Sequence, residues 1–445
     1  SPSHTRQRPA RFRRAGLFFA PARDRPRGGV LGWCHPHHWE ESPGKGEHHR
    51  TAMAHRILLL YNTPKAKRYF ETLRDHLSGL DIRVRPLLAS PSGPRLSALE
   101  RARIAEYTMR RKRARLRLPS WRVRLLDRGH RAAAQGHYNW ARRQIERLAP
   151  DAVGVWGGQA VDAHAARAAA DDTGVGRYTF ETGLLPQTTT CDPAGVNFDN
   201  SVPRDPAFYA AFSGAAPLPE SLQQRPGRRP QSAVPLPGDY VFVPFQVHLD
   251  SQLLMYSPWI RDMGHMFTAI SEAWRGTSLA RRGIQLVFKR HPSCPETYPE
   301  LRAATAREPG VIFAGGNTTE ELIRGARGVI TLNSTVGIDG LLMDRPVLAL
   351  GRACYAVPGV ADSARSVAEI ARWLEAVASD RPPAAGHREA FLRYLARDYC
   401  IPDPHKAPGP EHFRAMERRL SDHTRLVPAH PAGEEGAPGG ERHAS

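Results

Sequence analysis

Short apolar runs alternate with amphipathic helical stretches along most of the chain. Residues 57–61 (ILLLY) form the first apolar run, and a helical pattern over residues 65–77 follows it directly. Further apolar runs at 152–156 and 177–181 repeat this arrangement. Strands and helices that alternate in this way predict a mainly parallel sheet with helices on both faces.

The alternation stops at residues 223–237 (QQRPGRRPQSAVPLP), where several prolines fall in a stretch without a hydrophobic period. Such a stretch is typical of a linker between domains. A second alternation follows, and its apolar runs at 240–245, 284–289 and 328–332 predict another parallel sheet. We therefore predict an α/β protein with two Rossmann-like domains that face a cleft.

Both ends of the chain depart from this pattern. Residues 1–52 are rich in Arg, His and Pro, and the character changes at Met53. One hypothesis is that Met53 is the natural start of the protein, and the alternative is a basic targeting arm. The low complexity of the last residues is typical of a disordered tail. The predicted division is a leader at 1–52, a first Rossmann-like domain at 53–222, the linker at 223–237, a second Rossmann-like domain at 238–380, C-terminal helices at 381–422 and a tail at 423–445.

The chain has 445 residues and a formal charge of +19, and most of the excess lies in residues 1–52 and 101–131. A basic helix at 101–131 would be attracted to anionic lipid headgroups, and a solvated basic face is an equally good interpretation. Nucleic-acid binding is disfavoured, because aromatic residues are sparse there and no known binding module fits. The arginines predicted to contact an acceptor or a membrane are Arg110, Arg111, Arg113 and Arg115.

Hydropathy and cysteine content exclude several protein classes. No run of eighteen apolar residues occurs, so we expect no transmembrane helix. The five cysteines form no CxxC pair, which argues against a disulfide framework or a zinc site and favours a reducing compartment. The sequence contains no cluster of carboxylates that would indicate a metal site, so we expect metal-independent chemistry.

Polar side chains follow several predicted strands, at the positions where doubly wound sheets bind ligands. Glu181 ends a strand of the first domain, and a carboxylate there can act as a general acid or base. A loop glutamate paired with an arginine is the structural alternative. In the second domain, Gln246, Asp250 and Gln252 follow the strand at 240–245. Asp250 can act as a nucleophile or stabilise a cationic anomeric centre, and a helix N-cap explains it equally well.

Two further strand ends of the second domain carry groups that suit anions. Lys289 and His291 end a buried strand, where a phosphate or carboxylate would meet them. Asn333, Ser334 and Thr335 stand between a predicted strand and a helix, where free N–H groups and hydroxyls suit a phosphate. Simple Ser/Thr capping explains the same residues. The chain contains neither GxGxxG nor GxxxxGK[ST], which disfavours dinucleotide and P-loop binding.

Taken in order, these segments resemble the capsular polysaccharide synthesis family, the bacterial β-Kdo transferases of the KpsS/KpsC kind. The resemblance covers roughly residues 150–360 and is nearest to the short KpsS-like members. The sequence departs from the family pattern after Pro292 and in the turn after the first strand. These differences bear on the identity of the acceptor more than on the class of donor. The matching segments are FETGLLPQTTTCDPAGVN with SVPRDP, VFVPFQVHLDSQ, LVFKRHP and GVITLNSTVGIDGLLMDRPVLALGRACYAVPG.

The resemblance implies a GT-B-like fold, in which the C-terminal helices pack back toward the N-terminal domain. It implies transfer of 3-deoxy-octulosonic acid (Kdo) from CMP-Kdo, without a further cofactor and with retention at the anomeric carbon, to a lyso-phospholipid or Kdo-oligosaccharide acceptor. The catalytic candidates are Asp250, Glu181 and His291. The donor-binding candidates are Lys289, Ser334, Thr335, Asn333, Gln246 and Gln252.

The same resemblance implies a cytoplasmic enzyme that is peripheral to the anionic inner-membrane surface. Its further partners would be other capsule assembly proteins, and it would not bind nucleic acid. Two other functions fit the sequence: a transferase of similar fold with a different sugar nucleotide, and a noncatalytic lipid- or polysaccharide-binding protein of capsule export.

Overall fold

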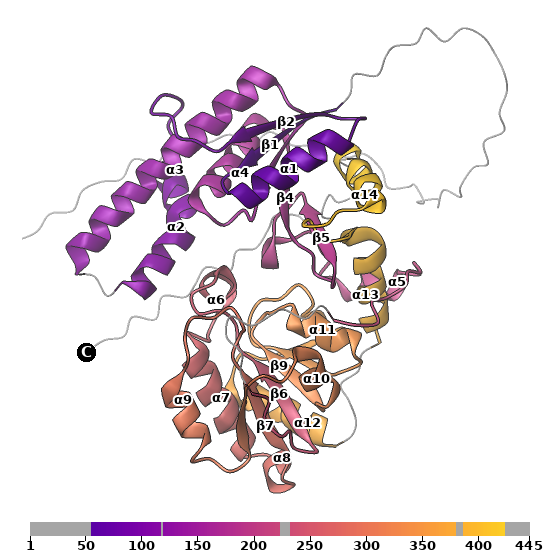
Figure 1. The fold of residues 1–445 in the computed structure, drawn as a ribbon. Helices are drawn as coiled ribbons and strands as arrows, with labels where there is room; N and C mark the ends of the chain where they lie inside the picture. The colour runs from indigo at the N-terminus through magenta and orange to yellow at the C-terminus, as the bar shows by residue number, and fades with distance from the viewer. Residues whose placement is uncertain (1–54, 117–118, 223–231, 380–385, 423–445) are drawn as a thin grey trace, which may run out of the picture. The chain divides into compact units, whose positions relative to one another are not determined.

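The computed structural model describes residues 55–116, 119–222, 232–379 and 386–422, all within the unit Met53–Ser445. The predictions for the leader, for the tail and for most of the linker fall outside the described residues. Two six-stranded sheets with flanking helices make up the described fold (Figure 1).

The first sheet has the strand order β12-β5-β4-β3-β1-β2. Its strands are β1 (Arg56–Tyr61), β2 (Asp81–Pro86), β3 (Ala152–Trp156), β4 (Gly176–Thr182), β5 (Thr188–Asp192) and β12 (Ile401–Pro402). The first four strands are parallel, and Ile57 of β1 pairs with Ile82 of β2 and with Ala152 of β3. β5 and β12 are antiparallel to their neighbours, which the hydrophobic pattern does not predict.

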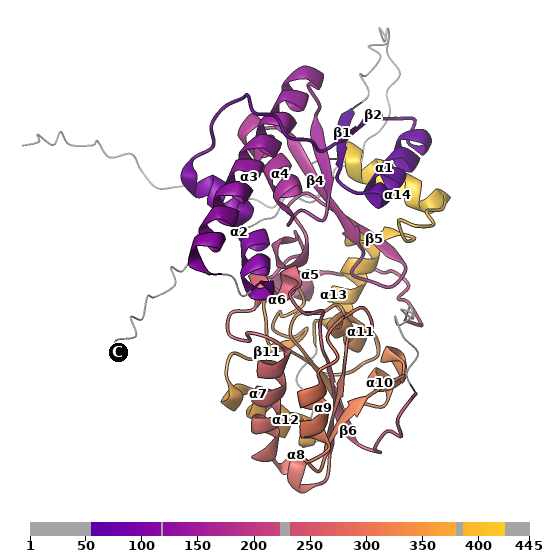
Figure 2. The same ribbon diagram turned by 60° about the vertical axis from the view of Figure 1, so that its left-hand side comes forward.

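The helices of this half cover both faces of the sheet (Figures 1 and 2). They are α1 (Pro64–His76), α2 (Ala98–Arg115), α3 (Ser120–Leu148) and α4 (Val161–Thr173). A 3-10 turn η1 (Asn197–Asp199) and the short α5 (Pro206–Ala211) follow β5, and Tyr209 of α5 is buried in the core of the second half. α1 begins where the Thr63 hydroxyl accepts a hydrogen bond from the N–H of Ala66 (3.2 Å), with Pro64 in the first turn. The predicted basic helix at 101–131 is thus two helices, α2 and the first part of α3. No residue from Ser120 to Ala133 is buried, so the sequence of this part of α3 shows no apolar period.

The second sheet is parallel throughout, with the strand order β11-β10-β9-β6-β7-β8. Its strands are β6 (Tyr240–Pro244), β7 (Gln285–Lys289), β8 (Val311–Ala314), β9 (Gly328–Thr331), β10 (Val347–Ala349) and β11 (Asp362–Ser363). This is the doubly wound Rossmann order, and the chain reverses direction across the sheet between β6 and β9. The prediction of two Rossmann-like sheets is therefore confirmed.

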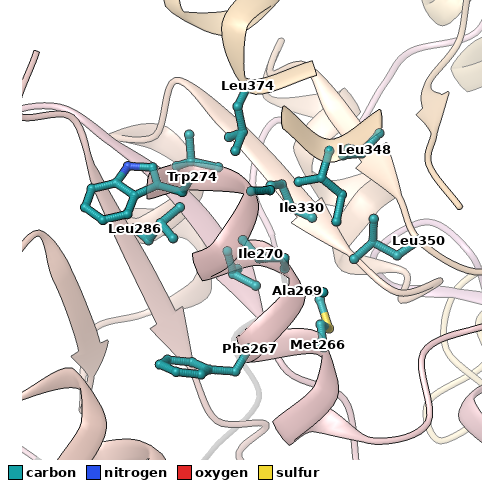
Figure 3. Packing of buried hydrophobic residues seen from close by; sticks show 14 of the residues in the cluster. Met266, Phe267, Ala269, Ile270, Trp274, Leu286, Ile330, Leu348, Leu350 and Leu374 are labelled. Carbon is teal, nitrogen blue, oxygen red and sulfur yellow. The ribbon is translucent and has the colours of Figure 1, made fainter. Parts of the chain in front are cut away.

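The core of this half lies between the sheet and its helices. The helices are α6 (Ser251–Tyr256), α7 (Met263–Arg275), α8 (Ser278–Arg281), α9 (Pro299–Thr305), α10 (Thr319–Arg324), α11 (Val336–Leu342) and α12 (Val367–Ala378). Figure 3 shows how Met266 and Ile270 of α7 approach Ile330 of β9 and Leu374 of α12. These side chains are fully buried, so truncating one of them would cost about 2–5 kcal/mol.

The C-terminal segment returns to the first sheet. It comprises α13 (Arg388–Tyr394), a π-helical turn η2 (Leu395–Tyr399), β12 and α14 (Pro410–Ser421). Met416 and Leu420 of α14 are fully buried in one cluster with residues of β1 and α1. The Tyr69 hydroxyl of α1 lies 2.8 Å from Nε2 of His412, so a polar contact accompanies this packing. The prediction that the C-terminal helices pack back toward the N-terminal half is confirmed.

Among the described helices, none combines the length and the apolar character needed to cross a membrane. The four cysteines that the structure describes, Cys191, Cys294, Cys354 and Cys400, are buried and free.

Candidate active site

A cavity of about 590 Å³ lies where the carboxyl ends of strands from both sheets meet. One wall comes from the first sheet: the end of β4, the turn to β5 and the loop after β12. The other wall comes from the second sheet: the segments after β6, β9 and β10. We call these the N-terminal wall and the C-terminal wall.

The C-terminal wall is built at the point where the second sheet reverses its strand order. Gln246 follows β6 and Asn333 follows β9, and the N–H of Asn333 donates to Oε1 of the buried Gln246 (3.0 Å). The Asn333 side chain in turn donates to the carbonyl oxygen of Gln252 (3.1 Å). These bonds fix the two strand ends to each other. Asn333, Gln252 and Thr335 line the cavity, whereas Gln246 supports them from behind.

Asp250 lines the cavity and also caps a helix. Its carboxylate accepts a hydrogen bond from the N–H of Leu253 (2.8 Å) at the start of α6. Burial raises the pKa of Asp250 to about 6, although hydrogen bonds from Leu253 and Gln246 oppose this shift. Asp250 can therefore be a helix N-cap and still act on a ligand, because a carboxylate that accepts one capping bond has lone pairs left.

Glu181 reaches the same cavity from the end of β4. Its Oε1 accepts the N–H of Thr182 (2.9 Å). Burial raises the pKa of Glu181, and the Thr182 N–H and the charge of Lys65 oppose the shift. The adjoining turn is tight: a Cβ at Gly183 would lie 1.9 Å from Oγ1 of Thr188 and 2.6 Å from its backbone carbon. Only glycine therefore fits at this point of the cavity wall.

The loop from β5 to η1 is organised by a single buried carboxylate. Asp192 accepts the N–H groups of Ala194 and Gly195 and both the N–H and the hydroxyl of Ser201, at 2.7–2.9 Å. This arrangement positions the segment 196–200, most of which lines the cavity.

Hydrogen bonds connect this loop to α6, the helix that Asp250 caps. The Tyr256 hydroxyl donates to Oδ2 of Asp199 (2.6 Å) and accepts from Nε2 of Gln159 (2.6 Å). Nδ2 of Asn197 donates to the Ser251 hydroxyl (3.2 Å). These hydrogen bonds join the two halves next to the cavity.

Four residues predicted at the site do not line the cavity. Nζ of Lys289 donates to the carbonyl oxygen of Asn317, so the structure does not show the predicted donor contact. Nδ1 of His291 accepts the N–H of Ser293 (3.1 Å), and its catalytic role stays a prediction. The Ser334 hydroxyl accepts the N–H of Val336 (3.2 Å), which is the capping alternative. Gln246, a predicted sugar contact, supports the wall as described above.

Four basic residues of the cavity were not predicted: Lys65, Arg352, His405 and Lys406. Lys65 follows the first strand of the first sheet, so the strand-end rule would have selected it. Arg352 stands within one of the segments that carry the family resemblance. His405 and Lys406 reach the cavity only because β12 pairs with β5, which no local pattern indicates.

Several buried polar atoms of the cavity lack a hydrogen-bond partner among the described residues. They are Oγ1 of Thr190, Oε1 of Gln252, Oδ1 of Asn333 and both ring nitrogens of His405. Buried polar groups are nearly always hydrogen-bonded, so this set indicates that the cavity binds a polar ligand or ordered water.

The four predicted surface arginines divide into two groups. Arg110 donates to the carbonyl oxygen of Leu254 in α6 (2.7 Å) and pairs with Glu106 (2.6 Å), so it joins the two halves. Arg113 and Arg115 are exposed, and so is Arg111. No group of three or more His, Cys, Asp or Glu that could hold a metal occurs within the described residues.

Comparison with known proteins agrees with the resemblance predicted from the motifs. The sequence profile of the capsule polysaccharide biosynthesis protein family matches residues 228–401. Protein FixF of Sinorhizobium fredii is 39% identical over 237 residues, which is 51% of this chain and 55% of FixF. The capsule polysaccharide export protein KpsS of Escherichia coli is 25% identical over 252 residues, which is 42% of this chain and 63% of KpsS.

The chain spans about half the length of the curated relatives that it matches, from 31% for the capsule polysaccharide modification protein LipB of Neisseria meningitidis to 63% for KpsS. Among solved structures, the β-Kdo 2,7 transferase KpsC of Thermosulfurimonas dismutans is similar with a TM-score of 0.39 and 13% identity. That alignment covers 82% of this chain and 99% of the other. A likeness at this level adds nothing to the fold that the strand order already defines.

Proposed function

We propose that the chain is a glycosyltransferase of capsule synthesis, because residues 228–401 match the capsule polysaccharide biosynthesis protein family. Its donor is CMP-Kdo, and its acceptor is a lipid or an oligosaccharide. The observation that carries this proposal is the pair Glu181 and Asp250. These two carboxyl groups, both with a pKa raised by burial, line one polar cavity between the strand ends of two Rossmann-like sheets.

The two carboxyl groups suit a double displacement with retention. In the first step, the Asp250 carboxylate attacks the anomeric carbon as the bond from that carbon to the CMP phosphate breaks. In the second step, the acceptor hydroxyl attacks the same carbon, the bond to Asp250 breaks, and the hydroxyl proton passes to Glu181. Two successive inversions give net retention.

Electrostatics fits a donor with two anionic groups. A CMP-Kdo donor carries a phosphate on its anomeric carbon and a carboxylate beside it. Arg352 lines the C-terminal wall and makes no ion pair with another described residue, and the unpartnered amide oxygens of Gln252 and Asn333 lie on the same wall. We propose that Arg352 neutralises the leaving phosphate, while Asn333, Gln252 and Thr335 orient the nucleotide and the sugar. With this cation in place, we expect no metal requirement.

The tip of the α2–α3 hairpin suits an anionic membrane surface. Leu116, Trp121 and Leu125 are exposed there, with 37%, 55% and 62% of their surface accessible. Exposed arginines such as Arg113 and Arg115 stand beside them. A basic surface with exposed aromatic and aliphatic side chains is typical of peripheral membrane contacts. We propose that this tip brings the enzyme to the bilayer that holds a lipid acceptor.

The test is a transfer assay with the full chain, CMP-Kdo and either lyso-phosphatidylglycerol or a Kdo-oligosaccharide. We expect release of CMP together with a Kdo-bearing product, an unchanged rate after addition of a chelator, and retained configuration by NMR. Turnover with other sugar nucleotides alone would replace the donor assignment. Binding of lipid or polysaccharide without turnover of any sugar nucleotide would refute the enzyme assignment.

A further inference from the structure

The N-terminal wall of the cavity carries positive charge that the proposed donor contacts do not use. Lys65 lies in the first turn of α1, and His405 and Lys406 follow β12. All three line the cavity together with Glu181. They meet because β12 pairs with β5 and because Oγ1 of Thr189 in β5 donates to the carbonyl oxygen of Asp403 (2.9 Å).

His405 is buried, with only 7% of its surface exposed, and neither ring nitrogen has a hydrogen-bond partner among the described residues. Its ring packs at 62° against Trp156 with the centroids 4.7 Å apart, and at 81° against Tyr69. Two aromatic side chains thus hold the ring, and its nitrogens make no hydrogen bond to a described residue. A buried imidazole with two unsatisfied nitrogens on a cavity wall indicates a hydrogen-bonding ligand.

The two lysines make this wall positive. Neither Lys65 nor Lys406 forms an ion pair with another residue that the structure describes. Nζ of Lys65 lies 4.4 Å from the ring centroid of Trp156, so the same indole contacts both Lys65 and His405. Burial lowers the pKa of Lys65, and the charge of Glu181 opposes that shift. Two ammonium groups face one carboxylate, so an additional anion would be stabilised here.

We propose that Lys65, His405 and Lys406 form a subsite that binds a phosphate or carboxylate group of the acceptor and so places the acceptor hydroxyl beside Glu181. The donor contacts proposed above belong to the second sheet, whereas all three subsite residues belong to the first. The assignment to the acceptor rests on the proposed function, but the binding of an anion at this place does not.

Binding is tested without any transfer reaction, by NMR of the full chain with labelled histidine. The His405→Gln variant assigns the His405 resonances, and the probes are inorganic phosphate, acetate and neutral glycerol. Burial and the two lysines lower the pKa of His405 to about 4. We therefore expect bound phosphate or acetate to shift these resonances and to raise the pKa of His405, and glycerol to do neither.

Matched variants show which residues the phosphate-induced change at His405 depends on. Lys65→Gln with Lys406→Gln should weaken the phosphate effect by about tenfold, the loss expected for charge-assisted contacts. Lys67→Gln should leave it unchanged, because Lys67 lies in the same helix but pairs with Glu71 (3.8 Å) outside the cavity. Arg352→Ala should also leave it unchanged. The subsite would be refuted if neither phosphate nor acetate shifted the His405 resonances. It would also be refuted if phosphate shifted them equally in the double lysine variant.

Kinetics then assigns the subsite to the acceptor. In the double lysine variant, the acceptor KM should rise about tenfold while the donor KM stays within about threefold. The acceptor that loses more, lyso-phosphatidylglycerol or Kdo-oligosaccharide, identifies a phosphate or a carboxylate as the natural group. A rise in the donor KM alone would overturn the acceptor assignment. A chain that binds anions at His405 but transfers no sugar would refute the proposed function and leave the subsite standing.

Discussion

In the C-terminal wall of the cavity, the polar residues lie within a few positions of the strand that places them: Asp250 and Gln252 after β6, and Asn333 and Thr335 after β9. In the N-terminal wall, Glu181 ends β4, Lys65 follows β1, and His405 and Lys406 come from a segment near the C-terminus. The C-terminal wall is assembled within one sheet, at its switch point. The N-terminal wall depends on the pairing of β12 with β5, which are far apart in the sequence.

This difference has consequences for stability and for activity. The hydrogen bond between Tyr69 and His412 joins residues 343 positions apart, and that from Thr189 to Asp403 joins residues 214 positions apart. Contacts of such separation close long loops and gain nothing from neighbouring chain geometry, so they need a well-packed anchor. We expect the C-terminal wall to tolerate changes elsewhere in the chain and the N-terminal wall to depend on α14.

The largest expected effect is on catalysis and comes from the C-terminal wall. Asp250→Asn should lower kcat by about 10³-fold or more, because an amide cannot form the covalent intermediate. Asn caps helices about as well as Asp, so α6 should persist. The control is Asp262→Asn, since Asp262 caps α7 in the same way (2.8 Å to the N–H of His265) but does not line the cavity. Equal turnover in the two variants would contradict the nucleophile assignment.

The same variant should show how pH acts on this wall. A carboxyl group whose folded pKa is about 6, above its ordinary value, binds protons more tightly in the folded than in the unfolded protein. It therefore reduces the free energy of unfolding as the pH rises from about 4 to about 6. Asp250→Asn should exceed the wild type in stability at pH 8 by roughly 1–3 kcal/mol and match it near pH 4. Turnover of the wild type should rise through pH 6. Thermal unfolding at several pH values measures the first effect, and a stability gap that grows toward low pH would contradict the argument.

The next effect in size tests the anchor of the N-terminal wall. Met416 is fully buried between α14 and the first sheet, so Met416→Ala should lower the free energy of unfolding by about 2–5 kcal/mol. Arg414→Ala, on the exposed side of the same helix, should change it by less than about 0.5 kcal/mol. Urea denaturation gives both values. Because α14 secures β12, Met416→Ala should also raise the acceptor KM more than the donor KM, and the reverse order would refute the predicted dependence.

The sequence predicts the second half of the fold better than the first, for a physical reason. Parallel strands buried on both faces read as continuous apolar runs, and the structure places β6, β7 and β9 at those runs. β5 (TTTCD) and β12 (two residues) lack such a run, because they lie at an antiparallel edge. The exposed first part of α3 has no apolar period at all.

The same limit applies to the site. The strand-end rule selects Glu181, Asp250 and Asn333, which line the cavity, but it cannot tell which strand lies at the switch point. Lys289 ends β7, one strand away from the reversal between β6 and β9, and its side chain turns toward the loop before α10. His405 has no strand signal in its neighbourhood, because its position follows from the pairing of β12.

A smaller effect distinguishes Lys289, the donor cation predicted from the sequence, from Arg352, the donor cation proposed from the cavity. Arg352→Ala should raise the donor KM about tenfold, since it removes one charge-assisted contact from the cavity. Lys289→Met should change that KM less than about twofold and act mainly on stability, because Nζ of Lys289 holds the carbonyl of Asn317. Steady-state kinetics with CMP-Kdo compares the two. The opposite pattern would restore Lys289 as the donor contact and would mean that the cavity rearranges when the donor binds.

The smallest expected effect lies outside both walls, at the hairpin tip. Arg113→Gln should weaken binding to vesicles that contain phosphatidylglycerol about fivefold, because one basic residue near an anionic surface contributes about 1 kcal/mol. Arg110→Gln should leave vesicle binding unchanged, because Arg110 already bonds to Leu254 and Glu106. Cosedimentation measures both affinities. If the two variants lose the same affinity, the basic stretch acts through its total charge, and the division of these arginines between the membrane and α6 is wrong. If only Arg113→Gln loses affinity, α2 contacts the membrane through its end near Arg113 and contacts α6 through Arg110. One helix then connects the lipid surface to the C-terminal wall of the cavity.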